Sequence, residues 1–502
     1  MPEIRLFGAA TLKVGEKKIV KVDDTEILFI QLADSLVAVQ PKCPHAGGPL
    51  EQGAICNNRL VCPWHMGTFA LPTGDLLEPP PLKGLDTYAV RVDGADVFIN
   101  PVPKQHKLPS PSQAGNSRTF LLVGAGAAST VAAITLRNEG FAGQIVAVDP
   151  IPDEPVDRTQ LSKQALAGKM PLEKTRLESL EHFGVERHVA SVTQFSTNPP
   201  SARLSNGATI DFDAALVATG GIPKRLDISG ADLAFTLRHT TDVNAILERA
   251  NPGKHAVIIG TSFIALEAAS ALTQKGLVVT VIGKNTDLPF AKKFGDRVAK
   301  AMVALHEKNG VTFRLGTNLL AITPGGVTLR AEARSEQLAA DFVLFGVGVA
   351  PTLAFDHDLP LAQTGGGIAT DETLRVGDNV FVAGDIANVN GTRIEHWRLA
   401  EQHGALAARN MLGFNQRYTG VPFFWTFHFG KRLGYLGDAN DWDEIVYDGD
   451  VEALTFLAFF LKQGIVAAVL SCGRDHDTAS LAEPMRNSLS LADLRGHLDP
   501  MT

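Results

Sequence analysis

Two closely spaced pairs of cysteine and histidine near the start of the chain constrain its fold more than any other feature. Cys43-Pro-His45 is followed, after sixteen residues, by Cys62-Pro-Trp-His65. Short β-type runs broken by Gly, Pro, Asn and Asp surround both pairs, so each pair is expected at the tip of a turn. Two thiolates and two imidazoles match a [2Fe-2S] cluster in which one iron takes both cysteines and the other both histidines. A Cys2His2 zinc site is the alternative, but its histidines usually lie together on a helix.

Composition predicts a globular protein of several domains. The chain has 502 residues, and at about 150 residues per domain this length predicts three or four domains. A formal net charge of −8 argues against nucleic acid or an acidic membrane as the main partner. No apolar run reaches the roughly 18 residues of a membrane span, and the first ten residues lack a signal-peptide pattern, so a cytoplasmic protein is expected. Four cysteines are too few for a disulfide scaffold.

The residue pattern changes along the chain and marks the domain boundaries. Residues 1–100 read as short strands, and the Pro- and Ser-rich stretch 101–117 is expected to be a solvated linker. From Arg118 short apolar strands alternate with Ala-rich helical stretches, a pattern typical of parallel α/β folding. This pattern starts at Phe120 and again at Ala256, which predicts two nucleotide-binding folds. After about residue 420, aromatic segments punctuated by Gly predict a small α+β domain.

A glycine-rich turn follows the first apolar strand. In Gly124-Ala-Gly126-Ala-Ala-Ser129, Gly124 permits the tight turn and Gly126 lets the backbone approach a pyrophosphate at the helix N-terminus. Ser129 is small enough to keep the helix close to the strand. Asp149 ends the next strand and is expected to bind an adenosine ribose hydroxyl. The turn therefore predicts a dinucleotide site.

The sequence around the two Cys/His pairs resembles a known domain. The motifs CPHAGG (residues 43–48) and CPWHMG (62–67) are similar to the cluster loops of Rieske ferredoxins. The resemblance covers residues 1–100 and implies an all-β Rieske domain. Met66 stands where that family often has Gly, and Cys56 has no partner in the motif and is expected to be a plain buried thiol. The cluster ligands that the resemblance implies are Cys43, His45, Cys62 and His65.

Residues 118–420 resemble flavoproteins with two dinucleotide-binding domains. The segment DRTQLSK (157–163) is similar to one found in oxygenase-coupled ferredoxin reductases and in the apoptosis-inducing-factor family. ATGGIP (218–223) resembles the crossover from the FAD domain to the NAD domain, and FVAGD (381–385) resembles the second flavin motif. GTSFIALE (260–267) resembles the turn of that family's NAD(P)H domain. RIEHW (393–397) resembles the Glu-His-Trp segment beneath the flavin ring.

The resemblance implies a domain order and a set of site residues. Lys163 and Glu267 are expected near the flavin and the nicotinamide, where their ion pair positions the hydride donor. Trp425, at the start of the α+β domain, is expected to approach the flavin. The remaining residues expected to bind FAD or NAD(P)H are Arg158, Thr219, Gly220, Gly260, Ser262, Phe263, Gly348, Asp385, Glu395, His396 and Trp397. The expected domains are Rieske (1–100), linker (101–117), FAD-binding (118–244 and 369–420), NAD(P)H-binding (245–368) and C-terminal α+β (421–502).

Coenzyme choice depends on the residue that follows the second strand of the NAD(P)H domain. The strand 278–282 ends in Gly283-Lys284 where an acid would favour NADH. The missing carboxylate removes repulsion against a 2′-phosphate, and Lys284 either binds such a phosphate or faces solvent. The flavin half has no paired cysteines, which excludes a disulfide-reductase mechanism.

These features together predict an electron-transfer enzyme. The chain resembles Rieske-containing members of the apoptosis-inducing-factor-like flavoproteins, which implies electron flow from NAD(P)H through FAD to the cluster. The external acceptor is expected to be an oxygenase, a cytochrome or a similar protein, and the chain a monomer or homodimer. The linker would let the Rieske domain swing at high effective concentration. The main alternative is a flavin-based redox sensor with slow turnover; an NADH oxidase or peroxidase is disfavoured by the missing flavin-side cysteine.

Overall fold

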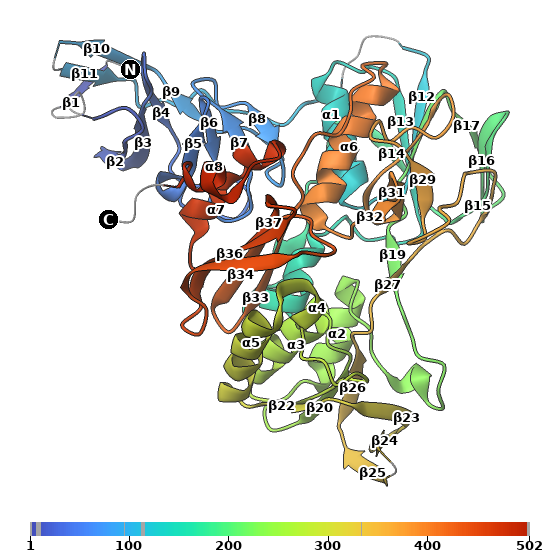
Figure 1. Cartoon of the computed structure of the whole chain (residues 1–502). Helices are drawn as coiled ribbons and strands as arrows, with labels where there is room; N and C mark the ends of the chain where they lie inside the picture. The colour runs from blue at the N-terminus through green and yellow to red at the C-terminus, as the bar shows by residue number, and fades with distance from the viewer. Residues whose placement is uncertain (1–2, 7–11, 95, 112–115, 333, 499–502) are drawn as a thin grey trace.

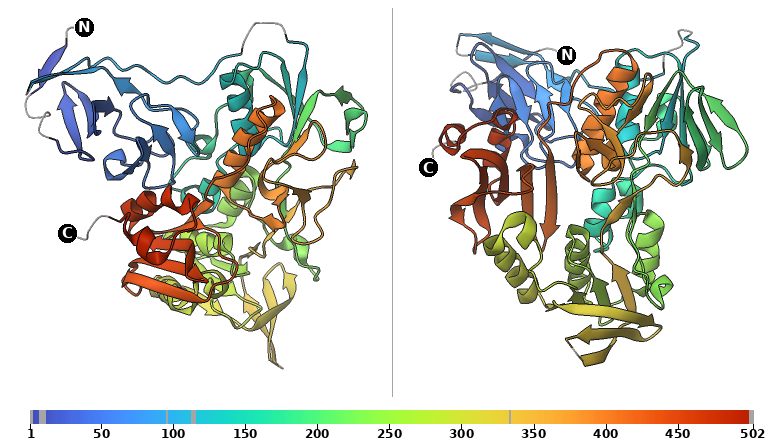
Figure 2. Two further views of the ribbon diagram at one scale, coloured as in Figure 1. Left: turned by 45° about the horizontal axis from the view of Figure 1, so that its top comes forward. Right: turned by 45° about the vertical axis from the view of Figure 1, so that its right-hand side comes forward.

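The computed structural model has four regions that pack into one body (Figure 1). A β-rich N-terminal region lies beside a first α/β unit, a second α/β unit lies below, and a C-terminal sheet lies between the N-terminal region and the second unit (Figure 2). No helix in the described part of the chain is both long and apolar enough to cross a membrane. The structure describes residues 3–6, 12–94, 96–111, 116–332 and 334–498.

The N-terminal region is built from three small sheets, as its short runs of β-type residues predict. The sheet orders are β2-β3-β4-β9, β5-β6-β7-β8 and β1-β11-β10. One of the two Cys/His pairs follows β4 and the other follows β6. The strands are β1 (Ile4–Leu6), β2 (Lys17–Val22), β3 (Thr25–Gln31), β4 (Leu36–Val39), β5 (Ala54–Cys56), β6 (Arg59–Val61), β7 (Thr68–Ala70), β8 (Leu76–Glu78), β9 (Thr87–Tyr88), β10 (Val90–Asp93) and β11 (Asp96–Ile99).

The first α/β unit has a five-stranded parallel sheet in the order β14-β13-β12-β18-β30. One face packs against α1 and α6, which lie side by side (Figure 1). The other face packs against the small sheet β17-β16-β15-β28. A Cβ atom at Gly404 of α6 would lie 2.1 Å from the carbonyl of Ala128, so glycine lets the two helices approach closely. The elements are β12 (Thr119–Val123), α1 (Ala127–Asn138), β13 (Gln144–Asp149), β14 (Val185–Val189), β15 (Val192–Thr197), β16 (Pro200–Leu204), β17 (Thr209–Asp211), β18 (Ala214–Val217), β28 (Asp356–His357), β29 (Ile368–Thr370), β30 (Val380–Val382), β31 (Ala387–Val389), β32 (Thr392–Arg393) and α6 (Trp397–Met411).

The second α/β unit repeats this plan with a four-stranded parallel sheet, β22-β21-β20-β26. The chain enters it through β19 and leaves through β27, and these two strands pair with each other. The elements are β19 (Gly221–Pro223), α2 (Thr240–Arg249), β20 (His255–Ile259), α3 (Phe263–Gln274), β21 (Val278–Ile282), α4 (Ala291–Phe294), α5 (Asp296–Lys308), β22 (Val311–Arg314), β23 (Thr317–Thr323), β24 (Gly326–Ala331), β25 (Arg334–Ala339), β26 (Phe342–Phe345) and β27 (Val349–Pro351).

The C-terminal region is a five-stranded antiparallel sheet with both faces buried. Its order is β33-β34-β37-β36-β35. Alternate side chains point to opposite faces of a strand, so Phe424 packs against the second α/β unit while Phe423 and Trp425 face the N-terminal region. The elements are β33 (Phe423–His428), β34 (Lys431–Gly437), β35 (Glu444–Asp450), β36 (Thr455–Lys462), β37 (Ile465–Cys472), α7 (Asp475–Leu481) and α8 (Leu491–Arg495).

A buried arginine joins the N-terminal region to the rest of the molecule. Arg398, on the first turn of α6, is 5% exposed. Its guanidinium donates to the carbonyls of Pro79 at 2.9 Å and Met66 at 3.1 Å in the N-terminal region. It also donates to the carbonyl of Val421 at 3.3 Å, just before the C-terminal sheet. One side chain therefore bonds three regions of the molecule.

Glu78 is the charged partner at this contact. It accepts hydrogen bonds from Gln402 at 2.5 Å and Arg486 at 2.7 Å, and it lies 3.4 Å from Arg398. Burial raises the pKa of Glu78, but the charge of Arg398, the Gln402 amide and Arg486 outweigh burial and lower that pKa. The carboxylate therefore stays ionised at the contact.

Further contacts between the N-terminal region and the C-terminal region extend this surface. Arg59 pairs with Glu483 at 3.0 Å, and the half-buried thiol of Cys56 points to the carbonyl of Ser480 at 3.8 Å. Cys56, which was expected to be a plain buried thiol, thus lies at the interface between the N-terminal and the C-terminal regions. This interface is apolar at its centre, where Ala54, Val61 and Met66 pack against the C-terminal sheet, and it is charged at its edge.

The first part of the expected linker is also held in place. Lys104 exchanges two backbone hydrogen bonds with Thr87, at 3.1 and 2.8 Å. The backbone of His106 donates to Asp86 at 3.1 Å, and its ring contacts the carbonyl of Thr73 at 2.9 Å. Lys104 and Gln105 are exposed, as expected of a linker, but the backbone bonds of Lys104 and His106 tie this stretch to the N-terminal region. Residues 112–115 lie outside the described residues.

We expect Arg398→Met to loosen the N-terminal region. The change leaves the carbonyls of Pro79 and Met66 without their donor, a loss of about 3 kcal/mol for a broken buried charge network. Faster tryptic cleavage at Lys104 or Lys107 and a lower thermal midpoint would report it. Arg409→Met on the same helix removes only a half-exposed pair with Glu139, which is worth less than about 1 kcal/mol, and serves as the control. Equal behaviour of the two variants would contradict the role of Arg398.

Candidate functional site

The two Cys/His pairs lie in loops with the same hydrogen-bond pattern. In the first loop the N–H of Cys43 donates to the carbonyl of Gly48, and the N–H of Gly47 donates to the carbonyl of Cys43, both at 2.9 Å. The second loop repeats this pattern from Cys62 to residue 67, at 2.8 and 3.2 Å. Each loop therefore closes on its own cysteine and carries its histidine inside the closed turn, two residues after Cys43 and three residues after Cys62.

Met66 occupies a position that favours glycine. It corresponds to Gly47 of the first loop, and both have positive φ, +60° for Met66 and +72° for Gly47. Non-glycine residues seldom adopt this conformation. The Met66 side chain is buried in the apolar cluster that joins the N-terminal region to the C-terminal sheet, next to Trp425. This packing gives a physical reason for methionine where glycine is common.

The four predicted ligands converge as two like pairs. The thiols of Cys43 and Cys62 contact each other, and the Nδ1 atoms of His45 and His65 lie 3.1 Å apart. Among the described residues, no group of three or more His, Cys, Asp or Glu side chains surrounds a single ion position. Two thiols in contact and two imidazoles in contact fit a two-iron cluster with one pair on each iron.

A cavity of about 700 Å³ lies between the two α/β units and the C-terminal sheet. Four of the predicted residues, Gly124, Ser129, Gly260 and Lys284, do not line it. The predicted residues that line it are Gly126, Asp149, Arg158, Lys163, Thr219, Gly220, Ser262, Phe263, Glu267, Gly348, Asp385, Glu395, His396, Trp397 and Trp425. The tertiary fold thus brings motifs from residues 126 to 425 around one space.

Two glycines that lie outside the lining shape the turns beside the cavity. Gly124 has φ +99°, and a Cβ atom there would lie 2.5 Å from the carbonyl of Ala218. Gly260 has φ +109°, and its Cβ would lie 2.3 Å from the carbonyl of Gly346. In both units the first glycine is therefore required by backbone conformation and by the neighbouring strand.

Two arginines give the cavity a positive site near the first turn. Burial and the nearby charge of Arg238 lower the pKa of Arg158 to about 10, whereas Asp385 and Asp149 raise it. Arg238 pairs with Asp385 at 3.2 Å, and its buried Nε has no hydrogen-bond partner among the described residues. Two guanidinium groups held together are stabilised by an anion, so they fit the pyrophosphate of a dinucleotide. Arg238 belongs to no sequence motif, which is why sequence reasoning missed it.

Other groups have roles that the sequence did not indicate. Both carboxylate oxygens of Asp149 accept backbone N–H groups at 2.8 Å, from Ala125 and Ile151, so this side chain also braces the glycine turn. Ser262 caps α3 by accepting from Ala265 at 3.2 Å. Burial lowers the pKa of His396 to about 3, and its Nδ1 has no partner among the described residues. Unpartnered buried nitrogen atoms beside the cavity fit a polar cofactor.

Lys163 and Glu267 form a buried ion pair at the cavity wall. Nζ of Lys163 lies 3.0 Å from Oε2 of Glu267, and the two side chains are 10% and 5% exposed. Ser162 also donates to Oε2 of Glu267. Thr426 of β33 donates to Oε1 at 2.7 Å. The structure therefore brings the predicted pair together and adds Ser162 and Thr426, neither of which sequence reasoning had assigned to the site.

Trp425 lies between the cavity and the Cys/His loops. It lines the cavity, and its ring centroid is 4.1 Å from that of His65 and 6.4 Å from that of His45. The carboxylate of Asp157, in the first α/β unit, lies 3.8 Å from Nε2 of His45. The two imidazoles therefore face the cavity, and the Trp425 side chain lies between them and the cavity.

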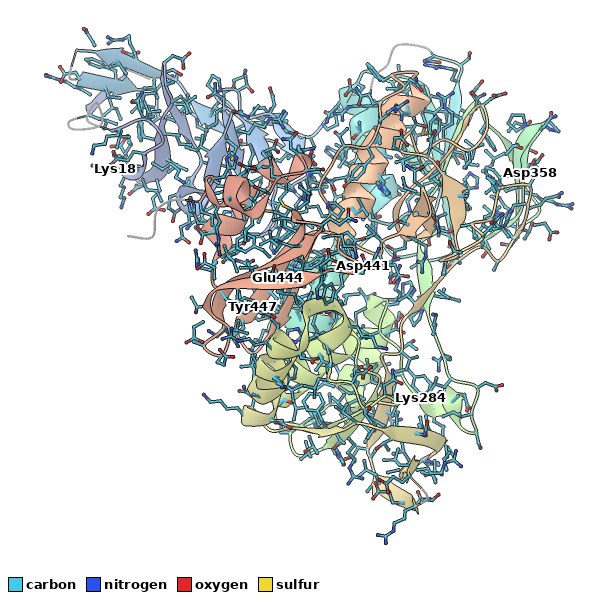
Figure 3. The ribbon with its side chains drawn as sticks, in the orientation of Figure 1. Lys18, Lys284, Asp358, Asp441, Glu444 and Tyr447 are labelled. Carbon is cyan, nitrogen blue, oxygen red and sulfur yellow. The ribbon has the colours of Figure 1, made fainter. Side chains whose placement is uncertain are left out.

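Lys284 is the predicted residue that lies apart from this cavity. It follows β21 and is exposed. In the view of Figure 3 it lies on the opposite side of the molecule from Glu444 and Tyr447 of the C-terminal sheet. Lys284 follows the second strand of the unit, and residues at this position bind the adenosine ribose of the coenzyme in folds of this kind.

The sequence matches two families. Residues 118–404 match the family described as pyridine nucleotide-disulphide oxidoreductase, and residues 4–89 match the Rieske [2Fe-2S] domain. Apoptosis-inducing factor 3 of Mus musculus is 32% identical over 510 aligned residues, which cover 96% of this chain and 83% of that protein. A ferredoxin–NAD(P)+ reductase of a Sphingomonas species is 29% identical and covers 70% of this chain and 88% of its own.

Solved structures match the reductase part. The ferredoxin reductase for the CYP199A2 system of Rhodopseudomonas palustris has a TM-score of 0.69 and 25% identity, covering 76% of this chain and 100% of that one. The covalent putidaredoxin reductase–putidaredoxin complex also has a TM-score of 0.69, at 24% identity, over 76% of this chain and 96% of that one. The second match is evidence of a shared fold.

We expect His65→Cys to change the cluster. Replacing one imidazole by a thiolate adds negative charge at the second iron and lowers the reduction potential. Electron paramagnetic resonance of the reduced protein, with iron and sulfide analysis, would show a different cluster or none. His106→Gln, in the same region but bonded to Thr73, is the control. An unchanged Rieske-type spectrum in His65→Cys would contradict the ligand assignment.

We expect Lys284→Ala to shift coenzyme choice toward NADH. If its ammonium group binds a 2′-phosphate, removing the charge raises the KM for NADPH about tenfold and leaves the KM for NADH unchanged. Steady-state kinetics with both coenzymes would measure the ratio. Lys254→Ala, another exposed lysine of this unit, which pairs with Asp341, is the control. The same NADPH to NADH ratio before and after Lys284→Ala would mean that Lys284 faces solvent only.

Proposed function

This chain belongs to the pyridine nucleotide-disulphide oxidoreductase family and carries an N-terminal Rieske [2Fe-2S] domain, and from this combination we propose that it is a self-contained ferredoxin reductase and ferredoxin. It is an NAD(P)H oxidoreductase whose cofactors are FAD and the Rieske cluster. Electrons pass from NAD(P)H through the flavin to the cluster and then to an external acceptor. The acceptor, the cytoplasmic location and the monomeric or dimeric state stay predictions.

One contact carries the proposal. Trp425 lines the cavity and meets His65 at a centroid distance of 4.1 Å. One buried aromatic side chain therefore contacts both sites. The docked Rieske domain is therefore held where the flavin cavity and the cluster site share one wall.

The residues of the cavity have separate tasks in this proposal. FAD supplies two-electron chemistry with the nicotinamide and one-electron chemistry with the cluster when it is bound. Arg158 and Arg238 hold the pyrophosphate. Asp385, already paired with Arg238, receives the ribityl chain. Lys163 and Glu267 orient the nicotinamide beside the flavin. No side chain has to act as a nucleophile, because this chain's residues bind, orient and exclude water.

The docked position of the Rieske domain limits how an external acceptor can approach the cluster. The His45 side chain is 13% exposed, and His65 is buried. Their imidazoles face the reductase, so the surface nearest the cluster is occupied in this arrangement. An acceptor therefore either approaches the remaining exposed edge at His45 or receives the electron after the Rieske domain separates from α6.

We expect anaerobic addition of NADH or NADPH to bleach the flavin and then reduce the cluster. Trp425→Leu should leave flavin bleaching intact and slow cluster reduction, because it removes the aromatic contact with His65. Stopped-flow absorbance follows both steps. Trp442→Leu, in the same sheet and packed against Phe460, controls for loss of a tryptophan. Flavin bleaching with a cluster that stays oxidised in the unmodified protein would rule out the internal transfer.

A further inference from the structure

A chain of buried polar side chains leads from the Lys163–Glu267 pair into the protein interior. Oγ1 of Thr426 lies 2.7 Å from Oε1 of Glu267 and 2.8 Å from Nε2 of His428. Nδ1 of His428 lies 3.2 Å from Nε2 of His306. Thr426 and His428 belong to β33, and His306 belongs to α5. These four residues are at most 4% exposed, so the hydrogen-bond chain runs from the cavity wall at Glu267 into the buried interior.

Glu267 fixes the direction of every hydrogen bond in this chain. Its carboxylate, paired with Lys163, only accepts, so the hydroxyl of Thr426 donates to it. The hydroxyl has one proton, and it therefore accepts from Nε2–H of His428. A neutral imidazole has one N–H, so Nδ1 of His428 accepts from Nε2–H of His306. Nδ1 of His306 is left as a bare acceptor, which agrees with its lack of a partner among the described residues.

Both imidazoles are neutral in this environment. Burial and the charge of His428 lower the pKa of His306 to about 2. Burial and the charge of Lys163 lower the pKa of His428 to about 3, although the carbonyl of Leu266 raises it.

The elements packed against the two rings add no further charge. The ring of Phe290 faces His428, and the rings of Phe313 and Phe429 face His306. The charged groups that bear on the chain are thus Lys163 and Glu267 at its cavity end.

We propose that Thr426, His428 and His306 are positioning residues, which keep the Glu267 carboxylate turned toward Lys163 while the coenzyme reacts. Because Thr426 always donates to Oε1, the other oxygen stays on Lys163 and Ser162. With Nε2–H of His428 donating to its oxygen, the Thr426 hydroxyl keeps its own proton for Glu267. The effect on coenzyme oxidation rests on the proposed function, whereas the proton arrangement does not.

A matched pair of variants at Thr426 tests the effect on the reaction. Thr426→Val keeps the shape of the side chain but removes the hydroxyl donor, so Oε1 of Glu267 keeps only the backbone N–H of Phe427, at 3.3 Å. We expect the acid limb of the flavin reduction rate to move up by about one pH unit, as for the loss of one hydrogen bond to an ionised group. Thr426→Ser keeps the hydroxyl and should restore the original profile. Equal profiles for Val and Ser would overturn the proposal.

Nitrogen-15 NMR of histidine tests the proton arrangement without any turnover. In the oxidised protein with both cofactors bound, the rings of His306 and His428 should both carry their proton on Nε2, with signals assigned from His306→Gln and His428→Gln. Glu267→Gln supplies an amide that can donate to Thr426, and it should shift the His428 proton toward Nδ1. An Nδ1–H or a charged ring in the unmodified protein would overturn the proposal.

The two readouts separate this inference from the proposed function. If NADH and NADPH both fail to bleach the flavin of the unmodified protein, the proposed function is wrong, and the tautomers still report on the hydrogen-bond chain. If bleaching occurs but the tautomers differ from Nε2–H, only the positioning role is wrong. If His428→Gln fails to fold, the variants Thr426→Val and Thr426→Ser still test the proposal, because serine and valine differ from threonine by few atoms.

Discussion

A buried guanidinium holds the domains of this protein in one arrangement. Arg398 begins α6 in the first α/β unit and donates to carbonyls of the Rieske domain and of the residue that precedes the C-terminal sheet. Its charge is balanced by Glu78, which two further side chains also bind. Because a buried charge without its partners is costly, separation of the Rieske domain carries a large free-energy cost. The short distance between the cluster site and the flavin cavity therefore depends on this contact.

The C-terminal sheet connects the two redox sites because its strand β33 has two different faces. Trp425 points toward the Rieske loops and touches His65. Thr426 and His428, on neighbouring positions of the same strand, contact Glu267 and continue to His306 in the second α/β unit. Side chains alternate along a strand, so these three residues of β33 serve the cluster side and the coenzyme side together. The sheet is therefore part of the site and not only a cover for it.

Local motifs account for the parts of the site that could be predicted. The Cys/His loops and the glycine turns depend on backbone geometry within a few residues, so their chemistry is readable from spacing. The Lys163–Glu267 pair joins residues 104 positions apart, and only a family resemblance indicated it. Arg238 had no such signal: it lies in no motif, and its place beside Arg158 follows from the path of the chain between the two α/β units. The linker was predicted from composition, which does not report the backbone pairing of Lys104 with Thr87.

Residue spacing within short segments was enough to predict the ligand types for the cluster, the two nucleotide-binding turns and the order of the parts, because each depends on residues close together in the chain. The docking of the Rieske domain, the place of Trp425 between the cavity and His65, and the two histidines behind Glu267 became visible in the folded chain alone. The contacts that create them join residues more than a hundred positions apart. They arise from packing of whole surfaces, and the pattern of residues along one segment carries no record of which surface it will meet.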